Sequence, residues 1–120
     1  MNKREKPSGC CPVRAIKPLT RPDREKLLSV TKALADPNRL EILRLLAAQS
    51  GPLCACDIVD LFQLSQPTVS HHLKILKDAG LLCAERSGLW MFYEIRAEGV
   101  VALNGLLELL GSRQAISASV

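Results

Sequence analysis

Three closely spaced helix-start signals, each a capping Ser, Thr or Asp with a proline in the turn that follows, constrain the fold of this chain more than any other feature. They begin at Thr20, Asp36 and Ser65. A side-chain oxygen at such a position satisfies backbone N–H groups that have no partner at a helix start, and proline is tolerated there because its missing N–H is not needed. The apolar residues that follow each signal recur at helical spacing, so we expect three helices. These helices should end near Ala35, near Ala48 and just before Gly80.

The remaining segments predict two further helices and a hairpin. Ser50-Gly51-Pro52 breaks the chain, and residues 53–62 then carry apolar residues at helical spacing, which predicts a short helix with Cys54 and Cys56 on its first turn. Ser87-Gly88 is a turn dipeptide between two β-prone runs and predicts a β-hairpin. Residues 100–110 are apolar over much of a helix circumference, more than one small domain can cover, so we expect them to form a dimer interface.

Length and composition indicate one mainly α-helical domain. The chain has 120 residues, of which 48% are hydrophobic and only four are aromatic, as in a helix-rich globular protein. Residues 1–19 mix Lys, Arg and Pro without apolar periodicity and are interpreted as a flexible N-terminal arm, 20–111 as the folded domain and 112–120 as a C-terminal tail. The chain has no apolar run near the roughly 20 residues that span a membrane, and its leader lacks the apolar segment of a signal peptide. We therefore expect a cytoplasmic protein without a membrane partner.

The helix that begins after Ser65 has the pattern of a DNA-recognition helix. Val69, Leu73 and Leu76 form its inward stripe, whereas the opposite face is polar and carries side chains that can hydrogen-bond base edges. With the hairpin as a wing, this predicts a winged helix-turn-helix of order α-α-α-α-β-β-α that binds double-stranded DNA. We expect Lys74 and Arg86 to contact phosphates. The candidate DNA-binding residues are Gln66, Thr68, Ser70, His71, Lys74 and Arg86.

Four of the five cysteines form two close pairs, Cys10-Cys11 in the arm and Cys54-Ala55-Cys56 before the recognition helix. In a reducing cytosol, an odd number of closely spaced cysteines indicates metal-binding or reactive thiols and not a disulfide scaffold. The fifth, Cys83, follows Leu81-Leu82 in an apolar strand, and we expect it to be buried in the core.

Two blocks of sequence resemble the ArsR/SmtB family of winged-helix repressors. They are residues 33–43, ALADPNRLEIL, and residues 64–74, LSQPTVSHHLK. The box at residues 53–57, LCACD, is similar to the metal-binding box of that family's metalloid and heavy-metal sensors. The resemblance implies a homodimeric repressor, without enzymatic activity or a small organic substrate, that leaves its operator when a toxic metal or metalloid binds. A two-fold dimer places its recognition helices about 34–36 Å apart and so implies an inverted-repeat operator.

The expected ligand site combines both cysteine pairs. On a regular helix, residues i and i+2 point about 200° apart, so Cys54 and Cys56 cannot both bind one ion unless the first turn of the helix unwinds. The alternative is that one of the two thiols binds the ion together with thiols from elsewhere in the chain. Trivalent arsenic or antimony favours three soft sulfur ligands. The family's arsenic sensors have a further cysteine in the box, where this chain has Val59. We therefore expect an As(III) or Sb(III) site formed by Cys10, Cys11 and one or both of Cys54 and Cys56.

Two alternatives keep the same fold. Four thiolates from the arm and the box would suit Cd(II) or Pb(II), as in the family's cadmium and lead sensors. A thiol-redox sensor would instead oxidise Cys54 with Cys56, or Cys10 with Cys11. An enzyme is disfavoured, because the sequence lacks a Cys-x-x-Cys redox motif, a glycine-rich phosphate loop and a Cys-His-carboxylate constellation.

Overall fold

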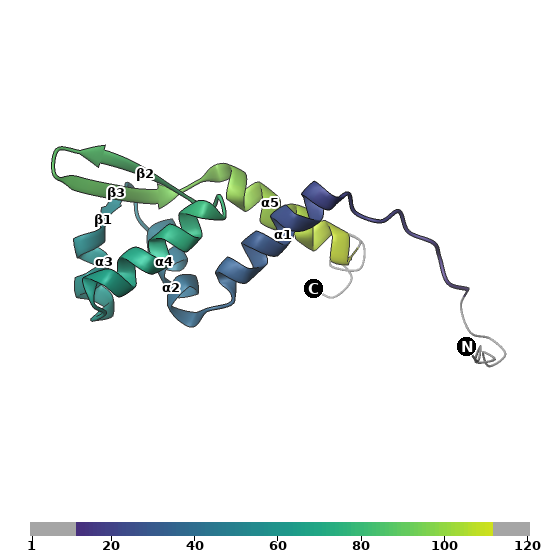
Figure 1. The fold of residues 1–120 in the computed structure, drawn as a ribbon, viewed down its shortest axis with the longest axis horizontal. Helices are drawn as coiled ribbons and strands as arrows, with labels where there is room; N and C mark the ends of the chain where they lie inside the picture. Colours follow the sequence, from purple (N-terminus) through teal and green to yellow (C-terminus); the bar gives the residue numbers. More distant parts are fainter. Residues whose placement is uncertain (1–11, 112–120) are drawn as a thin grey trace.

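The fold combines five helices with a small antiparallel sheet, in a computed structural model that describes residues 12–111. The elements are α1 (Arg21–Leu34), α2 (Pro37–Ala47), β1 (Leu53–Cys54), α3 (Ala55–Phe62), α4 (Gln66–Asp78), β2 (Leu82–Ser87), β3 (Trp90–Ile95) and α5 (Ala97–Leu110). Figure 1 shows α1 and α5 in contact at one end of the fold, with α2, α3, α4 and the hairpin gathered at the other. The predicted mainly α fold with a hairpin wing is confirmed, with one additional strand.

The three predicted helix starts are confirmed by their caps. The Thr20 hydroxyl accepts a hydrogen bond from the backbone N–H of Asp23 at 3.4 Å, before α1. The Asp36 carboxylate accepts from the N–H of Arg39 at 3.0 Å, before α2. Ser65 caps α4 in the same way. Each cap stabilises its helix because it satisfies a donor that the first turn leaves without a partner.

The predicted helix at residues 53–62 begins two residues later than expected. Leu53 and Cys54 form the short strand β1, which pairs antiparallel with β3 opposite Tyr93 and Phe92. The helix α3 starts at Ala55, with Cys54 as its N-cap residue in extended conformation. The apolar spacing of residues 53–62 does not reveal β1, because the strand exists only through its pairing with a distant segment.

The hairpin lies where the sequence predicts it, with its turn one residue further along. Ser87 pairs with Trp90, so Gly88 and Leu89 form a two-residue loop. Gly88 has a φ of 61°, a left-handed conformation that glycine adopts without steric cost. The strand order in the sheet is β1-β3-β2.

The core lies between the helices and the inner face of this sheet. The inward stripe predicted for α4 is confirmed, because Val69, Leu73 and Leu76 are fully buried. They pack in one cluster with Ile42 of α2 and Ile58 of α3. Burial of one such side chain stabilises the fold by about 1.5–3 kcal/mol. The apolar contacts therefore hold α4 against its neighbours and leave its polar face outside.

Within residues 12–111, none of the helices combines the length and the apolar character needed to cross a membrane.

Candidate DNA-binding face and thiol site

The outer face of α4 is polar and open to solvent. The side chains of Gln66, Thr68, His71 and Lys74 are exposed, and Ser70 is half-buried. The Gln66 carboxamide donates to the Ser70 hydroxyl at 2.9 Å. Side chains one helical turn apart thus form a row of donors and acceptors, which is what reading base edges in the major groove requires.

The two predicted phosphate contacts lie on different elements. Lys74 is on α4, where its Nζ forms an ion pair with Asp78 at 3.1 Å. Both side chains are more than half exposed, so this pair contributes little to stability and leaves the ammonium group available to a stronger anion. Arg86 is exposed on β2, opposite Met91 of β3, so it belongs to the wing. The structure brings five of the six predicted DNA contacts together on α4 and places Arg86 apart from them.

Cys54 and Cys56 lie together at the start of α3, in a geometry that differs from the predicted one. Cys54 precedes the helix, so the rule that residues i and i+2 of a helix diverge does not apply to this pair. The Cys54 sulfur accepts a hydrogen bond from the backbone N–H of Cys56 at 3.4 Å. The Cys54 N–H in turn donates to the Asp57 carboxylate at 3.2 Å. This reciprocal capping holds both thiols at one helix end without any unwinding of the helix.

The environment of Cys56 shifts the protonation equilibrium of its thiol. A hydrogen bond with the Cys54 side chain raises the pKa of the Cys56 thiol, and desolvation and the charges of Cys54 and Asp57 raise it further. At neutral pH the Cys56 thiol is therefore protonated. A thiol reacts with oxidants and binds soft ions as the thiolate, so a raised pKa slows oxidation, whereas a bound ion can still displace the proton.

The described part of the chain brings two of its three cysteine sulfurs together, which is not a complete site. Among residues 12–111, no cluster of three or more His, Cys, Asp or Glu side chains is arranged to hold a metal ion. The predicted ligands Cys10 and Cys11 lie outside the described residues. Cys54 is buried and Cys56 is exposed, so an additional donor would approach from the side of Cys56.

Cys83 is exposed, and the prediction that it belongs to the core is wrong. Along β2 the side chains alternate, so that Leu82 and Ala84 face inward and Cys83 faces outward, opposite Glu94. The Leu81-Leu82 run hides this alternation, because Leu81 precedes the strand. The strand β3 separates β2 from β1, and Cys83 and Cys54 pair with β3 at positions two residues apart, so their backbones are about 12 Å from each other. Cys83 is not a third member of the thiol pair.

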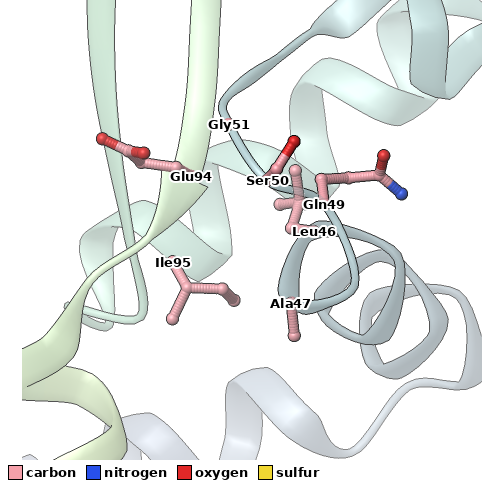
Figure 2. Close-up of a pocket in the computed structure, with 7 residues that line it drawn as sticks. All are labelled: Leu46, Ala47, Gln49, Ser50, Gly51, Glu94 and Ile95. Atoms are coloured by element: carbon pink, nitrogen blue, oxygen red, sulfur yellow. The ribbon is translucent and has the colours of Figure 1, made fainter.

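A shallow pocket of about 180 Å³ lies between the end of α2, the following loop and β3. Figure 2 shows that the polar ends of Gln49, Ser50 and Glu94 point in different directions. Convergent polar groups are what give a pocket its ligand specificity, and this pocket lacks them. It contains neither of the paired thiols.

A third surface is apolar and belongs to α1 and α5. Val101, Leu107, Leu109 and Leu110 of α5 are each at least half exposed, and Leu28 of α1 is nearly so. A contiguous apolar surface of this kind usually marks a protein interface.

An HTH pair formed by α3 and α4, followed by a two-stranded wing, defines the winged helix-turn-helix class of DNA-binding domains. Residues 36–83 match the family model described as "Bacterial regulatory protein, arsR family". The arsenical resistance operon repressor of Staphylococcus xylosus is 41% identical over 88 residues, which cover 73% of this chain and 83% of the repressor. This chain belongs to the arsR family, whose members are DNA-binding transcriptional regulators and not enzymes.

The chain is also similar to a cadmium resistance regulator and to a solved homodimeric DNA-binding domain. A cadmium resistance transcriptional regulatory protein, the CadC homolog of Staphylococcus aureus, is 34% identical over 90 residues, which cover 75% of this chain and 74% of the relative. A solved homodimeric winged helix-turn-helix DNA-binding domain from Mycobacterium bovis, described as a possible ArsR-family transcriptional regulator, has a TM-score of 0.60 at 34% identity. The match covers 72% of this chain and 79% of that domain.

Proposed function

We propose that this protein is a homodimeric repressor that leaves its operator when As(III) or Sb(III) binds its thiols. The observation that carries the proposal is the joint position of the Cys54 and Cys56 sulfurs at the start of α3, the helix that contacts the recognition helix. The arsenical resistance repressor from Staphylococcus xylosus, 41% identical, supports arsenic as the inducer. The proposed ligands are Cys10 and Cys11 together with one or both of Cys54 and Cys56.

The thiol pair is attached to both elements that would touch DNA. Cys54 belongs to β1, which pairs with β3 of the wing, and it also caps α3, which packs on α4. Ion binding by Cys56 requires its thiol to lose its proton, so the hydrogen bond between the Cys56 thiol and the Cys54 side chain must be lost, whereas the Cys56 N–H can still donate to the Cys54 sulfur. A change at this cap therefore reaches the wing and the recognition helix through direct contacts. Such coupling between two ligands typically amounts to about 1–3 kcal/mol.

The DNA contacts in this proposal are Gln66, Thr68, Ser70, His71 and Lys74 on α4, with Arg86 on the wing. Their exposure and their distribution over the two elements support these roles. Dimerisation is supported by the apolar surface of α1 and α5 and by the homodimeric relative from Mycobacterium bovis. The operator would then be an inverted repeat, with half-sites about 34–36 Å apart.

A cadmium- or lead-responsive repressor is the second candidate, favoured by the cadmium resistance relative. Both candidates use the same thiols, and they differ in the number of sulfurs around the ion. As(III) takes three thiolates, whereas Cd(II) accepts four.

Titration of the operator complex distinguishes the candidates. The reduced protein bound to a fluorescent operator fragment from its own promoter would be titrated with arsenite, antimonite, Cd(II) and Pb(II), with anisotropy as the readout. Release by arsenite and antimonite at low molar equivalents supports the arsenic proposal. Release by Cd(II) or Pb(II) alone refutes it in favour of the second candidate, and release by peroxide without any ion would identify a redox sensor.

Cysteine variants test the assignment of ligands. Cys54→Ser should bind the operator as the original protein does and should no longer respond to the ion, because serine retains the helix cap but not the sulfur. Cys83→Ser is the matched control and should respond fully, since Cys83 lies on β2 away from the pair. A full response of Cys54→Ser would place the ligand site elsewhere.

A further inference from the structure

The side chain of Arg39, near the start of α2, connects three helices. Its Nε donates to the backbone carbonyl of Ala33 at 2.6 Å, and its Nη2 donates to that of Lys32 at 3.3 Å. Both carbonyls belong to the last turn of α1. On the other side, Arg39 Nη1 lies 3.4 Å from Nδ1 of His72 on α4 and 4.0 Å from the Asp36 carboxylate. One guanidinium group thus joins the end of α1, the cap of α2 and the recognition helix.

The position of this guanidinium suits its charge. The carbonyls in the last turn of a helix have no partners within the helix and carry its negative dipole end, so a cation there is stabilising. The Arg39 side chain is only 13% exposed, and its hydrogen bond to the Ala33 carbonyl is part-buried, whereas the one to the Lys32 carbonyl is open to solvent. Lysine, with a single ammonium group, cannot make the same divergent set of contacts.

His72 is the buried polar residue of α4. It is 7% exposed, and within residues 12–111 it is the polar side chain that the core contains. An arginine side chain has donors and no acceptor, so in this hydrogen bond Nδ1 of His72 is the acceptor, in the tautomer that carries its proton on Nε2. The neighbouring His71 faces solvent. The two adjacent histidines therefore differ in burial, although their ring centroids are only 6.0 Å apart.

We infer that Arg39 and His72 are positioning residues that set the orientation of α4 relative to α1, so that operator affinity depends on a hydrogen bond between two side chains turned away from the DNA-binding face. The apolar stripe of α4 holds the helix in place, but apolar contacts are not directional and tolerate rotation or sliding. The Arg39–His72 contact is directional and links α4 to the helix at the other end of the fold. This inference rests on DNA binding by the family and does not depend on which ion is the inducer.

Three substitutions separate this role from simple packing. His72→Leu keeps a similar side-chain volume and removes the hydrogen-bond acceptor, whereas His72→Asn keeps an acceptor close to the position of Nδ1. Arg39→Lys keeps the positive charge and removes the planar guanidinium group with its several N–H donors. Operator affinity would be measured by anisotropy, with folding and oligomeric state followed by circular dichroism and sedimentation. Arg44→Lys is the matched control, because Arg44 is on the same helix and forms an exposed ion pair with Glu41.

The expected result is a loss of about tenfold or more in operator affinity for His72→Leu and for Arg39→Lys, with substantial recovery in His72→Asn and no change in Arg44→Lys. The double variant Arg39→Lys/His72→Leu should bind no more weakly than the weaker single variant, because both remove one shared interaction. The slope of log affinity against log salt should stay the same, since no phosphate contact is lost. If His72→Leu does not fold, the inference is tested by Arg39→Lys alone, whose operator affinity is compared with that of Arg44→Lys and of His72→Asn.

Three outcomes would overturn the inference. Additive losses in the double variant would show that the two residues act independently. A shallower salt dependence would show that they contact phosphates directly. Normal affinity of folded Arg39→Lys or His72→Leu would show that the contact has no influence on the recognition helix.

Discussion

At the scale of single residues, the thiol of Cys56 determines how ion binding should depend on pH. Its raised pKa, caused first by the hydrogen bond with the Cys54 side chain, keeps it protonated at neutral pH. Cd(II) must displace one proton from each protonated thiol that it binds, so its affinity should rise about tenfold per pH unit for each such thiol. Arsenite is the neutral As(OH)₃, and its reaction As(OH)₃ + 3 RSH → As(SR)₃ + 3 H₂O releases no net proton. Its affinity should therefore be independent of pH between about pH 6 and pH 8.

Operator release as a function of pH measures this difference. In Cys56→Ser, the slope of log Cd(II) affinity against pH should fall by about one, because one proton fewer is displaced. A flat Cd(II) profile in the original protein would contradict the protonated state assigned to Cys56. Cys83→Ser should leave both profiles unchanged, since this thiol lies on the wing.

Lys74 is the residue whose loss should change the salt dependence of operator binding. Its partner in the free protein is the exposed Asp78, and DNA phosphates would replace that weak ion pair. Lys74→Ala should weaken operator binding and leave ion affinity unchanged. Because a dimer carries two copies, the slope of log affinity against log salt should become shallower by about two.

The control for Lys74 is another exposed lysine. Lys26 lies on α1, at the end of the fold away from the wing, so Lys26→Ala should not change the slope. An unchanged slope for Lys74→Ala would show that this side chain does not contact a phosphate.

At the scale of elements, the sequence predicts best what is encoded locally. The starts of α1, α2 and α4 follow from Thr20, Asp36 and Ser65, because a cap satisfies neighbours only three residues away. The inward stripe of α4 follows from its periodicity in the same way. The sequence also shows that Cys54 and Cys56 are close, since they are two residues apart.

The features that sequence reasoning missed depend on distant segments. The strand β1 exists because Leu53 and Cys54 pair with β3, and that pairing turns Cys54 from a helical residue into a cap. The outward position of Cys83 depends on the register of the hairpin. The contact of Arg39 with His72 joins residues of α2 and α4, and periodicity within one helix contains no signal for it.

The close approach of α5 to the turn after α4 leads to a prediction about Gly99. A Cβ at this position would lie 2.7 Å from the Gly80 carbonyl oxygen and 2.8 Å from the Leu81 Cα. Because these are backbone atoms, the helix would have to move, at a cost of about 1–3 kcal/mol. At Gly105 of the same helix an added Cβ meets open space in the protomer.

We therefore expect Gly99→Ala to be less stable than Gly105→Ala by about 1–3 kcal/mol, since both gain equally in helix propensity. Urea unfolding at matched protein concentration measures the difference, because dimerisation makes stability depend on concentration. Equal stability of the two variants would show that α5 can move away from Gly80 without cost.

At the scale of the whole molecule, the polar and the apolar surfaces lie at different ends of the fold. The polar face of α4 and the wing lie at one end, and the apolar surface of α1 and α5 lies at the other (Figure 1). Dimerisation through α1 and α5 would fix the distance between two recognition helices, and it is this distance that selects an inverted repeat. Arg39 lies between the two ends, where it touches both α1 and α4.

Loss of the dimer should therefore reduce operator affinity even when the DNA-binding face is untouched. Leu109 is 55% exposed and lies beside α1, so Leu109→Glu would place a carboxylate from each protomer in the proposed interface. An unpaired buried charge costs several kcal/mol, and we expect the dimer dissociation constant to rise about 100-fold or more.

Leu61→Glu is the matched control, because Leu61 is 64% exposed on α3, outside the α1–α5 surface. Sedimentation should show monomers for Leu109→Glu and dimers for Leu61→Glu, and only the former should lose tight operator binding. A dimeric Leu109→Glu protein would place the interface on another face, and the recognition helices would then not have the spacing that α1 and α5 impose.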